Sequence, residues 1–236
     1  KELFATPRRT AIEEGELNQD EEDLIQKEDM VVTVSMSGYI KRVPLNLYRA
    51  QRRGGKGKSG MNTRDEDVVS EVFVANTHTQ LLFFTSRGVV HAMKVYRLPM
   101  GSIQARGKAL VNMLPLEEGE TISTIMPMPE DQETWDQMEI MFATSKGSVR
   151  RNALSDFTNI RANGKIAMKL EEGSDEDLIA VSVCDEDSDV LLTTRSGRCI
   201  RFAATDVRQF ASRNSTGVRG VKLGKDDVVM SMSILT

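Results

Sequence analysis

The chain contains four copies of one pattern of apolar and polar positions. In each copy an apolar run ends on Ser or Thr, a glycine follows three residues later, and a second run alternates apolar with polar residues. Alternation on both sides of a short polar turn predicts a β-hairpin, with the glycine at positive φ. The copies read "VVTVSMSGYIKRV", "LLFFTSRGVVHAM", "IMFATSKGSVRRN" and "VLLTTRSGRCIRF", and their turn glycines are Gly38, Gly88, Gly147 and Gly197.

A second glycine follows each predicted hairpin, and a further apolar strand follows that glycine. No hairpin comes after the fourth of these strands, so the chain is expected to end at the start of a fifth unit. The second glycines are Gly57, Gly107, Gly164 and Gly217, and the strands after them read "VVSEVFV", "TISTIM", "LIAVSV" and "VVMSMSIL".

Units of this kind predict an all-β, propeller-like fold, because one unit cannot bury both faces of its own sheet. The turn glycines are 50, 59 and 50 residues apart, and no segment holds a long helical period. We expect an acidic arm or linker at residues 1–30, which carry ten acids against four bases, and a β domain at 31–236. Its units are expected at about 31–66, 67–117, 118–172 and 173–223, with the start of a fifth at 224–236.

The basic residues follow the same repeat, although the formal net charge of the chain is −4. Four stretches, each running from a hairpin to just past its second glycine, hold 25 of the 31 Lys and Arg and only two acids. These stretches are 31–60, 85–112, 144–169 and 193–222. Blades arranged around an axis would bring the four copies onto one rim, which predicts a basic track for nucleic acid.

The composition narrows the kind of nucleic-acid contact and excludes other chemistry. Aromatic residues are only 5% and do not interleave with the bases, so a stacking platform for single strands is not indicated. Cations on glycine-rich loops favour contact with duplex phosphates instead. Cys184 and Cys199 are expected to be reduced thiols, with no metal site and no membrane segment. His78 and His91 are given no catalytic role, and Trp135 is interpreted as a loop anchor.

The stretch "QRRGGKG" at 51–57 resembles the box motif found in C-terminal domains of the DNA gyrase A subunit. The likeness covers essentially residues 22–235 and includes "EDLIQKEDMVVTVSMSGYIK", "ARGKALVNMLPLE" and "TGVRGVKLG". It implies a β-pinwheel, a propeller-like disc that usually has six blades, of which four hairpin units are visible here. It also implies that duplex DNA wraps with a positive hand around the basic rim, which enables negative supercoiling.

The resemblance implies two groups of DNA-contacting residues, those of the box and those of the basic rim. Arg52, Arg53 and Lys56 would meet phosphates, and the box glycines would let backbone N–H groups approach an anion. The box residues are Gln51, Arg52, Arg53, Gly54, Gly55, Lys56 and Gly57. The rim residues are Lys41, Arg42, Arg49, Lys58, Lys94, Arg97, Arg106, Lys108, Arg150, Arg151, Arg161, Lys165, Arg198, Arg201, Arg213 and Arg219.

The resemblance also sets expectations for the longer protein, a bacterial type II topoisomerase. Expected partners are double-stranded DNA, the rest of the gyrase A subunit and the gyrase B subunit, in the cytoplasm. The holoenzyme is expected to use ATP and Mg²⁺, with no cofactor in this fragment. The fragment is expected to be monomeric and to carry no catalytic residue, because Tyr39, Tyr48 and Tyr96 stand in repeat contexts unlike the DNA-cleaving tyrosine motif.

Two other functions stay open from the sequence. The matching domain of the topoisomerase IV A subunit shares the repeat, but it generally lacks an intact box and wraps DNA poorly. A propeller that binds proteins would also have blades of this length. That class would give no reason for the bases to avoid the other segments of the chain.

Overall fold

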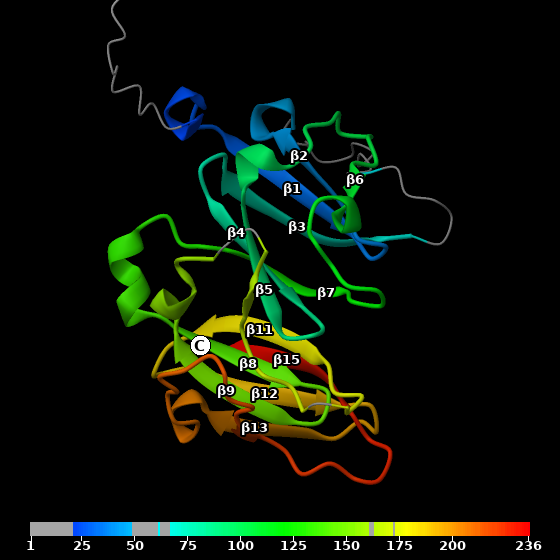
Figure 1. Ribbon diagram of the computed structural model, residues 1–236, viewed down its shortest axis with the longest axis vertical. Helices are drawn as coiled ribbons and strands as arrows, with labels where there is room; N and C mark the ends of the chain where they lie inside the picture. Colours follow the sequence, from blue (N-terminus) through cyan, green and yellow to red (C-terminus); the bar gives the residue numbers. More distant parts are fainter. Residues whose placement is uncertain (1–20, 49–60, 62–66, 161–162, 172) are drawn as a thin grey trace, which may run out of the picture.

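The computed structural model describes residues 21–48, 61, 67–160, 163–171 and 173–236. The box and most of the acidic arm therefore lie outside the described residues. The described part is all-β: its strands form four small antiparallel sheets in a propeller-like arrangement, as the sequence predicted. Figure 1 shows the sheets following one another along the long axis of the molecule.

The first two sheets have four strands each. Sheet A has the order β3-β1-β2-β6, and sheet B the order β10-β5-β4-β7. The strands of sheet A are β1 (Asp29–Ser35), β2 (Tyr39–Pro44), β3 (Val69–Asn76) and β6 (Lys108–Ala109). Those of sheet B are β4 (Gln80–Thr85), β5 (Val89–Lys94), β7 (Ile122–Pro127) and β10 (Lys165–Ile166).

The other two sheets repeat this plan, and sheet D has three strands in the described part of the chain. The orders are β11-β8-β9-β14 in sheet C and β13-β12-β15 in sheet D. The strands of sheet C are β8 (Glu139–Thr144), β9 (Ser148–Ala153), β11 (Leu178–Cys184) and β14 (Val218–Arg219). Those of sheet D are β12 (Asp189–Thr194), β13 (Cys199–Ala203) and β15 (Val229–Leu235).

Short 3-10 helices connect the strands. Those that end a hairpin strand turn the chain toward the next segment after a few residues, which keeps the connections compact. Their bounds are η1 (Glu21–Leu24), η2 (Leu45–Leu47), η3 (Val95–Arg97), η4 (Leu110–Asn112), η5 (Gln132–Gln137), η6 (Leu154–Phe157) and η7 (Ala204–Asp206).

All four predicted hairpins are present. In each, the N–H of the turn glycine donates to the carbonyl of the Ser or Thr three residues earlier, at 2.9–3.0 Å. The glycine φ values lie between 76° and 87°, the left-handed region that a residue without a Cβ enters at little cost.

The strand after each second glycine does not open the following sheet. It pairs antiparallel with the first strand of the hairpin before it, as β3 does with β1 and β15 with β12. The strand expected to begin a fifth unit therefore completes sheet D. The pairing is antiparallel because the chain comes back to the turn end of the hairpin's first strand after the loop that follows the hairpin. The free edge of that first strand is then beside it.

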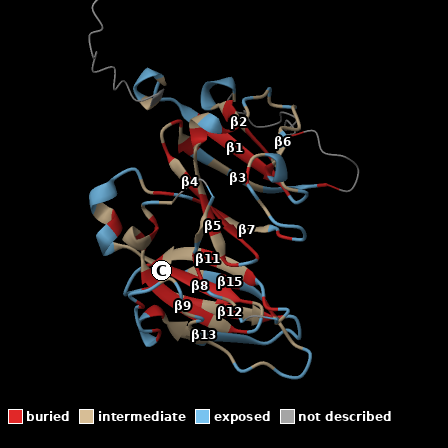
Figure 2. Cartoon of the chain, in the orientation of Figure 1, coloured by how far each residue is buried: buried red, intermediate tan, exposed pale blue. Residues whose placement is uncertain are grey.

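A hydrophobic core fills each space between consecutive sheets. Along β4, Leu81 and Phe83 pack toward sheet A while Leu82 and Phe84 pack toward sheet C. Strands β4 and β8 are therefore buried on both faces, as Figure 2 shows for the central strands. A third cluster joins sheets C and D.

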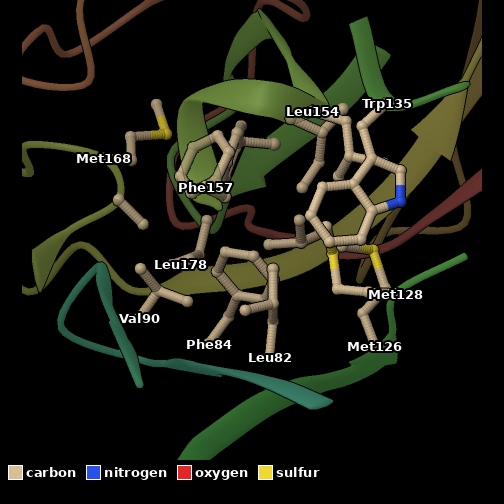
Figure 3. Close-up of a cluster of buried hydrophobic side chains, with 14 residues drawn as sticks. Leu82, Phe84, Val90, Met126, Met128, Trp135, Leu154, Phe157, Met168 and Leu178 are labelled. Carbon is tan, nitrogen blue, oxygen red and sulfur yellow. The ribbon is translucent and has the colours of Figure 1, made fainter. Parts of the chain in front are cut away.

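The core between sheets B and C contains a cluster of aromatic side chains (Figure 3). The rings of Phe84 and Phe157 lie 6.0 Å apart, nearly edge to face, and Phe142 joins them. Trp135 on η5 is buried at the rim of this cluster, and its indole N–H donates to the Pro129 carbonyl at 3.0 Å. Its interpretation as a loop anchor is confirmed.

Candidate nucleic-acid interface

Each edge strand comes from a loop of the following unit. We call the segments 98–109, 158–169 and 207–222, which carry β6, β10 and β14, the edge loops. The chain just past the edge strand then covers the preceding hairpin turn. The N–H groups of Leu110, Ala167 and Gly220 each donate at 2.8 Å to a turn-glycine carbonyl, those of Gly38, Gly88 and Gly147 respectively.

This exchange brings together bases that are far apart in sequence. Arg87 on the turn of sheet B lines one cleft with Lys169 of the edge loop, and Lys165 of the same loop lines a second cleft; Asn214 lines both. On sheet C, Lys146 lies on the turn that Gly220 covers, close to Arg219. The exposed bases of these turns and loops are Arg87, Lys108, Lys146, Lys169, Arg195, Arg198, Arg208, Arg219 and Lys222.

The edge loops 158–169 and 207–222 also contact each other. The Lys169 N–H donates to the Ser215 carbonyl at 3.3 Å, which joins edge loop 158–169 to edge loop 207–222. A cleft of about 580 Å³ lies where they meet, with Lys165 and Arg213 among its lining residues. The basic segments of the third and fourth units therefore form one continuous surface.

Three of the predicted rim residues lie inside the molecule. Lys41 and Arg150 are fully buried, and Arg151 is buried with an ion pair to Glu139 at 2.5 Å. Their charged groups also donate to backbone carbonyls of the next unit. Burial lowers the pKa of Lys41 and lowers that of Arg150 to about 10. None of the three offers exposed surface for a phosphate.

Other predicted rim residues are partly engaged within the chain. Arg42 donates to the carbonyls of Tyr96 and Leu98 at 2.9 Å. Lys94 pairs with Glu22 at 3.0 Å, and Arg201 with Asp189. The Arg106 guanidinium lies 3.6 Å from the centre of the Tyr39 ring, and Arg97 is exposed beside Tyr96. Outside the described residues lie Arg49, Lys58, Arg161 and the seven box residues, Gln51 to Gly57.

Sequence reasoning missed a recurring carboxylate just before the third strand of each sheet. Its oxygens accept from the hairpin turn or the loop beside it. Asp67 accepts from the Ser37 N–H at 2.9 Å, Glu176 from the Thr144 hydroxyl at 2.5 Å, and Asp227 from the Ser196 N–H at 3.0 Å. The Ser196 bonds hold the pKa of Asp227 at about 2. An acid two residues before the third strand, as at Asp67, Glu176 and Asp227, is the signal that could have found it.

The two histidines and the two cysteines lie at separate places in the fold. His78 Nε2 lies 2.8 Å from the Ile25 carbonyl oxygen, and His91 is buried in β5. Cys184 and Cys199 are both free thiols. Within the described ranges, no group of three or more His, Cys, Asp or Glu could hold a metal ion. Nor do those ranges contain a helix with the length and apolarity needed to cross a bilayer.

A family model described as DNA gyrase C-terminal domain, beta-propeller, matches the chain four times, at residues 29–76, 79–127, 139–185 and 188–236. Each matched segment holds the hairpin and the third strand of one sheet. The repeat seen in the structure is thus the repeat of that family.

Full-length relatives give the same result. The DNA gyrase A subunit of Rickettsia bellii (strain RML369-C) is 55% identical over 235 residues, which is 100% of this chain and 26% of the relative. The DNA gyrase A subunit of Escherichia coli (strain K12) is 43% identical over 231 residues, covering 98% of this chain and 26% of the relative. The chain spans about a quarter of the length of the curated relatives it matches.

Two solved structures share the fold. The crystal structure of the C-terminal domain of DNA topoisomerase IV superposes with a TM-score of 0.75 at 25% identity, over 90% of this chain and 62% of that one. The structure of a DNA gyrase A C-terminal domain superposes with a TM-score of 0.63 at 25% identity, over 87% of this chain and 64% of that one.

Proposed function

Because this chain belongs to the family of DNA gyrase C-terminal domains, we propose that it binds, bends and wraps duplex DNA without reading its sequence. The observation that carries the proposal is the repeated contact between a hairpin turn and the basic edge loop of the next unit. Exposed Lys and Arg on such loops neutralise phosphates, whereas sequence would be read from base edges in the grooves. The box residues 51–57 would add further phosphate contacts.

A duplex that contacts the edge loops of successive sheets in a propeller-like body has to bend. Bending 20–30 base pairs by 40–90° costs about 1–6 kcal/mol, and each added phosphate contact offsets part of this. A positive wrap would present a second segment of the same DNA for strand passage, and negative supercoils would result. The wrap, not a chemical step, is the part that this chain plays in our proposal.

The proposal extends to the longer protein. The chain would act beside the rest of the gyrase A subunit and with the gyrase B subunit, in the cytoplasm of a bacterium. ATP and Mg²⁺ would be used by other parts of that holoenzyme, an ATP-dependent type II topoisomerase. Cutting and rejoining of DNA would take place there as well.

The salt dependence of binding tests the DNA contact itself. A surface that touches about ten phosphates should give a plot of log affinity against log salt with a slope of about −9. Fluorescence anisotropy with a labelled duplex of mixed sequence measures it. An affinity that does not change with salt would contradict the proposal.

The box is tested in the holoenzyme. Arg52, Arg53 and Lys56 are changed together to Ala, and the control changes Lys1, Arg8 and Arg9, three bases of the acidic arm. We expect the box variant to relax supercoiled DNA but to introduce no negative supercoils, while the control supercoils like the parent. Supercoiling that survives the loss of all three box cations would remove the box from the mechanism.

A second candidate is the wrapping domain of the topoisomerase IV A subunit. The higher TM-score with the topoisomerase IV domain, 0.75 against 0.63, favours it. The intact "QRRGGKG" favours the gyrase domain instead. The topology of DNA bound by this chain separates the two, because only a gyrase-type domain is expected to wrap with a strong positive hand.

A further inference from the structure

The third residue after each hairpin glycine occupies one register position in every sheet. It is Lys41 in β2, His91 in β5, Arg150 in β9 and Ile200 in β13. The first three are buried, with relative exposures of 0%, 2% and 0%, and each lies against the edge loop of the next unit. Ile200 is 38% exposed, and sheet D has no edge loop in the described part of the chain.

Arg150 shows the contact most completely. Its Nη1 donates to the carbonyls of Arg213 at 2.6 Å and Ser215 at 2.9 Å, both in edge loop 207–222. Its Nη2 donates to the carbonyl of Ala167 in edge loop 158–169. One guanidinium therefore joins two successive edge loops, and the Phe142 ring, 4.9 Å away, backs it.

Lys41 repeats the bonds to loop carbonyls, and His91 occupies the same position in close packing against its edge loop. The Lys41 ammonium donates to the carbonyls of Ser102 at 3.0 Å and of Ile103, in edge loop 98–109. His91 lies so close to Gly164 that a Cβ on that glycine would come within 2.7 Å of the imidazole Cε1. The position is thus polar wherever an edge loop covers it and apolar where none does.

The direction of these carbonyls has a consequence for the outer surface of the loops. A trans peptide is planar, with its N–H opposite its C=O. Because the carbonyls of Ser102 and Ile103 turn toward the buried cation, the N–H groups of Ile103 and Gln104 turn away from it. Successive N–H groups with one direction form a concavity that attracts anions.

We propose that Lys41, His91 and Arg150 are positioning residues: each holds the edge loop of the next unit so that its bases and outward N–H groups meet DNA phosphates, without touching DNA itself. The inference rests on the proposed DNA binding. In this proposal Arg150 also sets the distance between two successive phosphate-contacting loops, because its single side chain binds both. The buried Arg150 guanidinium is stabilised by several oxygen dipoles: Asn152 on its own strand supplies an amide oxygen, and the seated loops supply the backbone carbonyls.

The test uses the full-length protein that contains this chain. Arg150→Met removes the donors and keeps an unbranched apolar side chain, and Arg150→Lys keeps the charge but has one nitrogen for carbonyls on two loops. The matched control is Ile200→Met, at the same register position in sheet D. Hydrogen exchange over residues 211–217 reports the loop, and the salt slope of duplex binding reports the phosphates.

We expect Arg150→Met to speed exchange at 211–217 by roughly tenfold or more while the strands of sheet B keep their protection. The salt slope should become shallower by about 1–2, since each lost phosphate contact removes about 0.9. Arg150→Lys should lie between the parent and the Met variant in both readouts. Ile200→Met should match the parent.

Several outcomes would overturn the proposal. Arg150→Met with parental exchange and slope would do so, and so would faster exchange with an unchanged slope, because loop position would then not matter to DNA. If the Met variant does not fold, hydrogen exchange at 211–217 that is unchanged in Arg150→Lys contradicts the positioning role of Arg150. A parent that binds DNA with no salt dependence contradicts the proposed function instead, and the exchange data still report on the loop.

Discussion

At the scale of the residue, the Lys and Arg side chains of this chain fall into two groups, one exposed and one buried. Arg219 and Lys108 are exposed on edge strands, whereas Lys41 and Arg150 are buried under edge loops. The repeat in the sequence predicts all four on the rim. The signal for the difference was present, because adjacent residues on a strand point to opposite faces and the pairs Lys41–Arg42 and Arg150–Arg151 cannot both face outward.

The seat of an edge loop on a hairpin turn can be tested with one methyl group. Gly88 and Gly197 both have positive φ, at 76° and 81°, but a Cβ on Gly88 would overlap the Met168 carbonyl, while a Cβ on Gly197 meets nothing within 4 Å. Gly197→Ala should lower the free energy of unfolding by about 1–2 kcal/mol through backbone strain alone. Gly88→Ala should cost a further ~1–3 kcal/mol, because the loop must move. Urea denaturation measures both, and equal losses would contradict the contact.

The carboxylate of Asp227 makes stability depend on pH in the acid range. The pKa of Asp227 is about 2 in the folded protein, against about 4 in an unfolded chain. A lowered pKa means that its contribution to stability is complete above about pH 5 and is lost as the pH falls through 4 toward 2. The free energy of unfolding of Asp227→Asn should therefore vary less over this window than that of the parent. An NMR titration that places the Asp227 pKa near 4 would contradict the assignment.

At the scale of the element, sheet D differs from the others at one edge. Strands β2, β5 and β9 each pair with an edge strand, whereas β13 has no such partner in the described residues, and Cys199, Ile200 and Arg201 on it are exposed. In the other three sheets the corresponding positions are mostly buried. Pairing with an edge strand thus goes together with burial of the second hairpin strand.

The two thiols report this difference directly. Cys199 lies exposed on β13, while Cys184 is buried and burial raises its pKa to about 12, with Glu139 adding to the effect. In the 236-residue chain at pH 8, one thiol should react with Ellman's reagent at once and the second only after unfolding. Cys199→Ser should abolish the fast phase. Two thiols that react at one rate would contradict the placement of these strands.

The sequence predicted the hairpins well because they are local. Alternation and a glycine at a fixed distance are enough for β4 and β5, whose register follows from the turn. The pairing of β6 with β2 could not be predicted in this way, since two residues carry no periodicity and the partner lies about 70 positions away. Alternation shows that two neighbouring bases on one strand face opposite sides, but not which side a loop covers, so the exposure of each base could not be predicted from the sequence alone.

At the scale of the whole molecule, charge and topology combine. Four basic stretches separated along the chain belong to hairpins and loops of successive sheets, and the third and fourth of them are in direct contact through Lys169 and Ser215. The formal net charge of −4 conceals this arrangement. We expect the row of edge loops to curve the duplex and not only to bind it.

The most direct measurement is the linking number of DNA closed on the protein. Nicked circular DNA is incubated with increasing amounts of this chain and sealed with ligase, the protein is removed, and the topoisomers are separated on gels. A positive wrap leaves a shift toward positive supercoils that grows with the amount of protein. Topoisomers unchanged from ligation without protein, or shifted to negative values, would contradict the account.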